Sequence, residues 1–129
     1  MAEYEADLAE TDLAKWESQL RKGSLSLAVL ATLRKGDSYG LEILRHLKND
    51  ASITVAEGTV YPILSRLKAA GFVDSEWVEA DAGHPRKYFR LTVNGRRYLK
   101  QVSRAWYDFA HGMDRLLERE QIHGKRRVS

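Results

Sequence analysis

Basic side chains gather in one part of this 129-residue chain. Between Ala82 and Tyr107 there are seven bases and no acid. Such a run of cations is typical of proteins that bind a polyanion, because cations replace the counterions of phosphate groups. The alternative is a solvated helix face followed by a basic tail at 125–127. The seven bases are Arg86, Lys87, Arg90, Arg96, Arg97, Lys100 and Arg104.

The overall net charge of +3 conceals this asymmetry: residues 1–22 carry −3 and residues 81–129 carry +7. The absence of cysteine excludes disulfides and thiol catalysis. No apolar run reaches the ~18 residues of a membrane span, so we expect a cytoplasmic protein without membrane contact. The four histidines are scattered and no glycine-rich phosphate loop occurs, so we expect no enzyme, no metal and no cofactor.

Glycine residues and changes of hydrophobic period divide the chain into elements. Thr11 is a plausible cap for a first helix that Gly23 ends, and Ser24 is a plausible cap for the second. Asp37 or Ser38 is expected to cap the next helix. Its inward residues would be Leu41, Leu44 and Leu47. The predicted helices cover 12–22, 24–35, about 38–49, 57–70 and 93–118, and a β-hairpin joins strands at 72–79 and 86–91.

The helix predicted at 57–70 has two different faces. Its apolar residues are Val60, Ile63, Leu64 and Leu67, which lie on one side at helical spacing. The opposite side carries small and hydrogen-bonding residues, which indicates a face that approaches another surface closely. These residues include Gly58, Thr59, Tyr61, Pro62, Ser65 and Arg66.

The last predicted helix has Thr92 as its expected N-cap. It carries an apolar stripe with heptad spacing. The stripe consists of Tyr98, Val102, Ala105, Phe109, Gly112 and Leu116, widened by Leu99, Trp106, Met113 and Leu117. A stripe this broad favours pairing with a second copy of the chain. The alternative is that the helix folds back onto its own core.

Helices followed by a two-stranded hairpin are the element order of the winged helix. The predicted fold is therefore mainly α with a small β-hairpin: a winged helix-turn-helix, an N-terminal helix and a long C-terminal dimerisation helix. In this fold the third helix enters the major groove of DNA and the hairpin, or wing, reaches phosphates or the minor groove. A dimer would match a palindromic operator.

Four ordered motifs resemble those of the PadR-type transcriptional regulators. KW at 15–16 with LRKGSL at 20–25 is similar to the start of that family, and SYGLEI at 38–43 to its "YGYEI" segment. EGTVYPILSRL at 57–67 resembles the recognition helix, and GHPRKYFRLT at 83–92 the wing. The resemblance covers about 15–118. Ala56 departs from the family's frequent serine, and the acidic segment 1–12 lies outside the match.

The resemblance implies a dimeric winged-helix repressor of the shorter branch, without a multi-helix C-terminal domain. It divides the chain into an acidic segment and helix (1–22), a DNA-binding domain (23–92), a dimerisation helix (93–118) and a basic tail (119–129). The expected DNA contacts are Tyr39, Thr59, Tyr61, Ser65, Arg66, His84, Arg86 and Lys87. The expected dimer contacts are Trp16, Leu20, Val102, Trp106, Phe109, Met113 and Leu116.

Two other functions stay open at this stage. Some dimers of the short branch hold flat aromatic drugs between paired tryptophans, and Trp106 matches that position. The protein would then be a sensor whose dimer cleft binds a small aromatic effector. The other is a winged-helix module that binds a protein instead of DNA. For individual residues, Tyr61 would otherwise pack under the wing, Arg66 would pair with an acid, and Trp106 would simply fill an interface.

Overall fold

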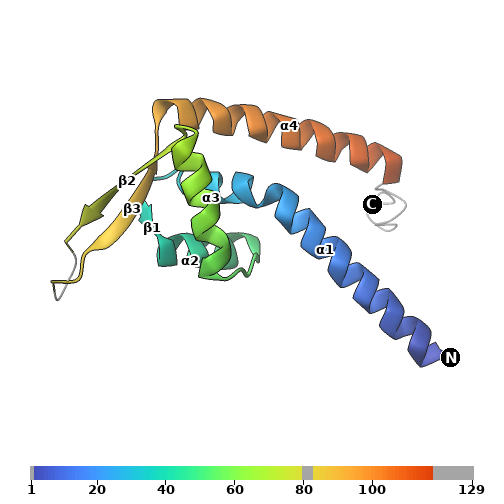
Figure 1. Ribbon diagram of the computed structural model, residues 1–129. Coiled ribbons are helices and arrows are strands. Elements are labelled where there is room, and N and C mark those ends of the chain that lie inside the picture. The colour runs from blue at the N-terminus through green and yellow to red at the C-terminus, as the bar shows by residue number, and fades with distance from the viewer. Residues whose placement is uncertain (1, 80–82, 118–129) are drawn as a thin grey trace.

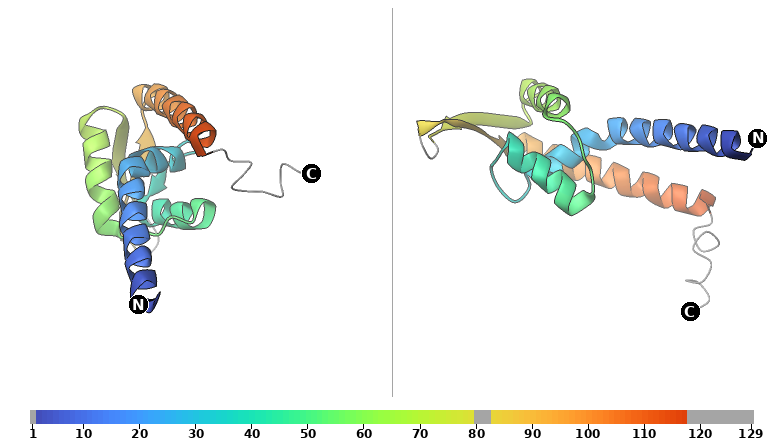
Figure 2. Two further views of the ribbon diagram at one scale, coloured as in Figure 1. Left: turned by 90° about the vertical axis from the view of Figure 1, so that its right-hand side faces the viewer. Right: turned by 90° about the horizontal axis from the view of Figure 1, so that it is seen from below.

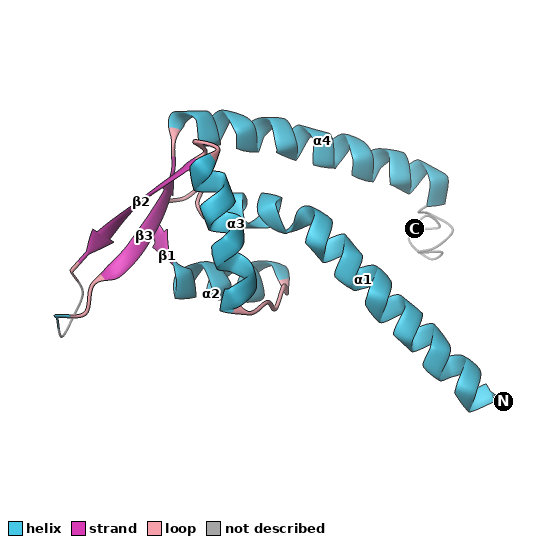
Figure 3. Ribbon diagram, viewed as in Figure 1, coloured by secondary structure: helices cyan, strands magenta, loops and turns pink. Residues whose placement is uncertain are grey.

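The computed structural model describes the backbone of residues 2–79 and 83–117 and the side chains of residues 11–79 and 83–117. The chain forms four helices and a small antiparallel sheet, whose hairpin projects to one side of the helices (Figures 1 and 3). The elements are α1 (Ala2–Thr32), β1 (Ser38–Tyr39), α2 (Gly40–Ala51), α3 (Glu57–Ala69), β2 (Val73–Val78), β3 (Arg86–Leu91) and α4 (Val93–Leu117).

The first helix is continuous, and the predicted break at Gly23 is wrong. α1 passes through Gly23 and ends at Thr32. Ser24 caps nothing, because its Oγ donates a hydrogen bond to the carbonyl of Leu20, one turn earlier and 2.8 Å away. A helix of 31 residues is about 46 Å long. The predicted start after Thr11 is also wrong, because the helix begins at Ala2.

The second helix begins one to two residues later than predicted. Ser38 is a buried strand residue and no cap, and the N-cap of α2 is Tyr39. The Glu42 carboxylate accepts the Tyr39 backbone N–H at 3.3 Å, which fixes this first turn. The buried face also differs from the predicted one: Leu47 is buried and Leu44 partly buried as expected, but Leu41 is 48% exposed and Ile43 is fully buried.

The third helix agrees with its sequence prediction. All four predicted apolar residues of α3 are buried: Val60, Ile63, Leu64 and Leu67. Ala56 occupies the N-cap position and supplies no side-chain hydrogen bond, because its methyl group cannot accept one. The chain turns after α3 at Gly71, whose φ of +84° is a conformation that favours glycine.

The sheet has three strands instead of the two predicted. β3 lies in the centre, with β2 on one edge and β1 on the other. Ser38 pairs with Phe89 and Tyr39 with Tyr88, so the turn after α1 is joined to the wing. The hairpin itself is confirmed, with Val73 opposite Leu91 and Val78 opposite Arg86.

The fourth helix is fixed to the rest of the domain at its first turn. The predicted cap is confirmed: Thr92 Oγ1 accepts the Gly95 N–H at 2.9 Å and donates to the Gly71 carbonyl at 2.6 Å. Gly95 packs so closely on Phe72 that a Cβ would collide with the Phe72 carbonyl oxygen. Phe72 also stacks on Tyr98, with ring centroids 4.0 Å apart.

One hydrophobic core holds these elements together. It contains Leu25, Val29, Leu30, Leu33, Ile43, Leu47, Val60, Ile63, Leu64, Leu67, Val73, Phe89, Leu91 and Leu99. From this core α1 and α4 leave on the side opposite the hairpin (Figures 1 and 2). Within the described residues, no helix is long and apolar enough to span a membrane.

Candidate nucleic-acid interface

The outer face of α3 is polar and accessible. Thr59, Ser65 and Arg66 are exposed, and no ion pair involves Arg66 within the described chain. Four buried apolar residues fix the orientation of this face by holding the opposite side of α3 in the core. α2 lies at the start of α3 and α4 at its end (Figure 1). The first turns of α3, the edge of the sheet and the start of α2 therefore lie together.

Tyr61 links α3 to both of its neighbours. Its hydroxyl lies against Gly40 at the start of α2, where a Cβ would collide with it. Its ring centroid is 6.4 Å from that of Phe89 in β3. The side chain is still 41% exposed. Tyr61 thus packs beside the wing and keeps part of its surface available to a ligand of α3.

Tyr39 is surrounded by cations and a second tyrosine. Arg45 Nη2 donates to the Tyr39 hydroxyl at 3.0 Å. The Arg86 guanidinium carbon lies 4.5 Å from the centre of the Tyr39 ring, and the Tyr88 ring meets it edge-on at 5.4 Å. Tyr39 therefore holds two arginines from different elements beside the start of α2.

Sequence reasoning missed Arg45, which is not among the expected DNA contacts. The only signal was its position six residues after Tyr39, close to the start of a helix. The hydrogen bond to Tyr39 directs the exposed Arg45 side chain toward the strand that pairs with the wing. No carboxylate lies within ion-pair distance of Arg45 in the described part of the chain.

The predicted wing cations lie on opposite faces of β3, because they are neighbours in one strand. Arg86 lies over Tyr39, whereas the Lys87 Nζ is 5.8 Å from both the Trp77 and Phe89 rings. Neither has an acidic partner among residues 11–79 and 83–117. His84 is exposed where the strand begins. The tip at 80–82 lies outside the described residues.

Arg90 differs from the other two basic residues of β3. Its guanidinium is 2.9 Å from Glu76, 3.7 Å from Asp37 and 3.9 Å from Asp74. The hydrogen bond to Glu76 and the charges of the three carboxylates raise the pKa of Arg90. Its charge is already neutralised inside the wing, so it adds no free cation to this surface.

The residues predicted at a dimer interface form exposed apolar faces on α1 and α4. Trp16 is 58% exposed, Phe109 60% and Leu116 80%. Leu20, Trp106 and Met113 are also exposed, and Val102 is partly so. A groove with a volume of about 390 Å³ separates the two helices, and Leu20, Val102, Trp106 and Phe109 are among its lining residues.

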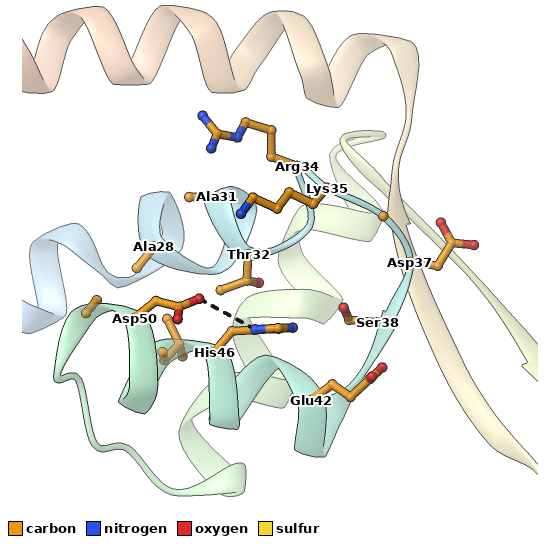
Figure 4. A pocket seen from close by; sticks show the side chains of 13 residues that line it. Ala28, Ala31, Thr32, Arg34, Lys35, Asp37, Ser38, Glu42, His46 and Asp50 are labelled. Atoms are coloured by element: carbon orange, nitrogen blue, oxygen red, sulfur yellow. Dashed lines mark ion pairs between the residues drawn. The ribbon is translucent and has the colours of Figure 1, made fainter.

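A second hollow lies between the end of α1 and α2, with a volume of about 580 Å³ (Figure 4). Its lining mixes both signs of charge, since it includes Arg34 and Lys35 as well as Asp37, Glu42 and Asp50. His46 Nδ1 lies 3.6 Å from Asp50 across one turn of α2. Because the charges alternate, this hollow selects neither anions nor cations.

Comparisons with known proteins agree with this architecture. A family described as "Transcriptional regulator PadR-like family" matches residues 29–101. A PadR family regulator from Eggerthella lenta is 35% identical, covers 86% of this chain and 97% of its own, and superimposes with a TM-score of 0.75. A PadR-like regulator from Bacillus cereus is 26% identical over 77% of this chain and 96% of its own, with a TM-score of 0.69.

A structure of Bacillus subtilis PadR in complex with operator DNA is also similar. It is 26% identical, with a TM-score of 0.56, over 60% of this chain and 45% of that protein. The matched part is thus less than half of the DNA-bound protein. The family match at residues 29–101 includes α3 and the wing, on which the polar face and the wing cations lie.

Proposed function

This chain belongs to the PadR-like family of transcriptional regulators, which are not enzymes, and we propose that it is a homodimeric, sequence-specific repressor that binds a palindromic operator in the cytoplasm. The observation that carries this proposal is the polar, exposed face of α3 beside cations that no carboxylate neutralises in the described structure. Sequence-specific DNA binding needs both features. Contacts to base edges determine which sequence is bound, and contacts to phosphates position the protein on the duplex.

In the proposed mechanism α3 enters the major groove. Thr59, Ser65 and Arg66 on its outer face approach base edges, and Tyr61 approaches them from the α2 side. Arg66 has the guanidinium geometry that suits a guanine edge. Sequence preference therefore belongs to α3.

The wing and the start of α2 supply affinity. Arg86 and Lys87 neutralise phosphates on either side of β3, and exposed His84 lies at the wing's outer end. The Tyr39 hydroxyl, which accepts a hydrogen bond from Arg45, contacts a phosphate together with that arginine. Because Tyr39 orders Arg86 by stacking, less conformational entropy is lost when that cation meets DNA.

The second copy covers the apolar faces of α1 and α4. The heptad stripe of α4 offers Val102, Phe109 and Leu116 to a partner helix, and Trp16 and Leu20 extend the apolar surface onto α1. Exposing this much apolar surface to water is unfavourable, so association is favoured. The two α3 helices would then face two half-sites about one DNA turn apart.

A second function is supported by the groove beside Trp106. Its lining is mostly apolar and includes an indole face on which a flat aromatic molecule could stack. Binding there would release the repressor from its operator. Titration with a planar cationic dye should quench Trp106, with Trp106→Phe separating its fluorescence from Trp16 and Trp77. Unchanged quenching in Trp106→Phe would remove this function.

The test of the main proposal is binding of the purified protein to DNA from upstream of its own gene. Fluorescence anisotropy at low salt should show binding that survives excess random DNA. Thr59→Ala should reduce the preference for the operator, and Phe109→Glu should lower the sedimentation mass to that of a monomer. Failure to bind any upstream DNA, with a folded dimer by circular dichroism and sedimentation, would favour the protein-interaction module.

A further inference from the structure

Four of the seven bases between Ala82 and Tyr107 are left over once the wing is accounted for. Arg86 and Lys87 belong to the proposed DNA surface, and Arg90 is neutralised by three carboxylates. The remaining four are Arg96, Arg97, Lys100 and Arg104, all exposed on α4. The basic run thus serves more than one surface.

Three of these cations form a straight stripe. Arg96, Lys100 and Arg104 are four residues apart, so they share one face of α4. That face is opposite the apolar stripe that contains Val102 and Phe109. It also lies away from the first turns of α3, because α4 is at the other end of that helix (Figure 1).

The stripe borders a groove with a volume of about 910 Å³. A fourth cation, Arg34, reaches the groove from the turn after α1, and its side chain extends toward α4 (Figure 4). Within the described chain, no carboxylate is within ion-pair distance of these four cations. Asp108 lines one end of the groove and pairs with none of them.

The groove also has apolar walls. Leu91 and Leu99, both nearly buried, line it, and the exposed ring of Tyr107 stands at one side. More of its lining is carbon than polar atoms. A nucleic-acid backbone offers only its sugar carbons to cover such walls, whereas an organic anion with a hydrocarbon chain matches both walls and cations.

We propose that this groove is a binding site for amphipathic organic anions, such as a long-chain carboxylate. The chain lies on Leu91, Leu99 and Tyr107, and the carboxylate is held by Lys100 and Arg104 with Arg34 opposite them. The site is separate from the groove beside Trp106, which opens between α1 and α4 on the apolar side and has no lysine or arginine in its lining.

The test is calorimetric titration of the full-length protein, without DNA, with dodecanoate below its micellar concentration. Dodecanoate should bind, dodecanol and dodecyltrimethylammonium should bind at least tenfold more weakly, and raising the salt should weaken dodecanoate binding. The double variant Lys100→Ala/Arg104→Ala should lose about tenfold in affinity, a modest value because the cations are exposed. Arg97→Ala, which removes a cation outside the groove, should leave affinity unchanged.

Three results would overturn the proposal. Equal binding of dodecanol would mean that the cations do not recognise the ligand. Loss of binding in Trp106→Ala, but not in the double variant, would place the ligand in the other groove. If the double variant instead loses affinity for random-sequence DNA and binds dodecanoate normally, the stripe is a nucleic-acid surface. None of these outcomes depends on the proposed repressor function.

Discussion

The salt dependence of operator binding tests the roles of the wing cations. Each phosphate contact that is lost reduces the slope of log affinity against log salt by about 0.9. A homodimer has two wings, so Arg86→Ala should reduce the slope by about 1.8, and Lys87→Ala by a similar amount. Neither residue has a carboxylate partner in the described chain, so the whole charge is available to DNA.

Two substitutions serve as controls for this measurement. Arg86→Lys keeps the charge and removes the stacked guanidinium 4.5 Å from the Tyr39 ring, so it should keep the slope while lowering affinity. Arg97→Ala removes a charge from α4, outside the wing, and should leave the slope unchanged. Anisotropy titrations at several salt concentrations measure all four variants. The reasoning is refuted if Arg86→Ala and Arg97→Ala have the same effect.

Three further predictions concern stability, measured by chemical or thermal unfolding. Thr92→Val removes the Oγ1 bonds to Gly95 and Gly71 and should cost about 1–2 kcal/mol; an unchanged stability would mean that the cap contributes nothing. Gly95→Ala drives a Cβ into the Phe72 carbonyl and should cost about 1–3 kcal/mol, whereas Gly58→Ala, with open space around it, should cost little. Arg90→Ala leaves Asp37, Asp74 and Glu76 close together without their cation, so it should lower the melting temperature more at low salt than at high salt; the same loss at both would contradict an electrostatic cause.

The features that sequence predicted correctly are those set by local periodicity. The four apolar residues of α3 repeat at helical spacing, and all are buried in the structure. Thr92 is predicted as a cap because a polar residue precedes a helical pattern, and its hydroxyl binds Gly95. The family motifs then point to the same elements, and the family match includes α3 and the wing.

The features that sequence missed depend on distant partners or on competing local preferences. β1 has two residues, too few for a visible alternation, and exists because Ser38 and Tyr39 pair with β3 some fifty residues later. The break at Gly23 failed because glycine costs only about 1 kcal/mol inside a helix that continues on both sides. The Ser24 hydroxyl can cap a following helix or bond to the backbone one turn earlier, and in the structure it donates to the Leu20 carbonyl.

Sequence alone also cannot tell which basic residues are paired with acids in the folded protein. The sequence counts Arg86 and Arg90 as equivalent bases, yet the two have opposite surroundings. Arg90 meets Asp74 and Glu76 of β2 and Asp37 from the turn after α1, whereas Arg86 meets an aromatic ring. Which cation stays free is thus a property of the sheet register.

The short strand β1 bears on which spacing of operator half-sites the proposed dimer would accept. By pairing with β3 it joins the start of α2 to the wing, and Tyr61 contacts both, so we expect these parts to move as one unit. Such a unit cannot adjust its wing to a displaced half-site. In the proposed dimer the separation of the two half-sites would then be fixed by the angle at which α1 and α4 meet their partners. A change of one base pair in operator spacing would therefore be resisted by the dimer interface and not by the DNA-reading surface.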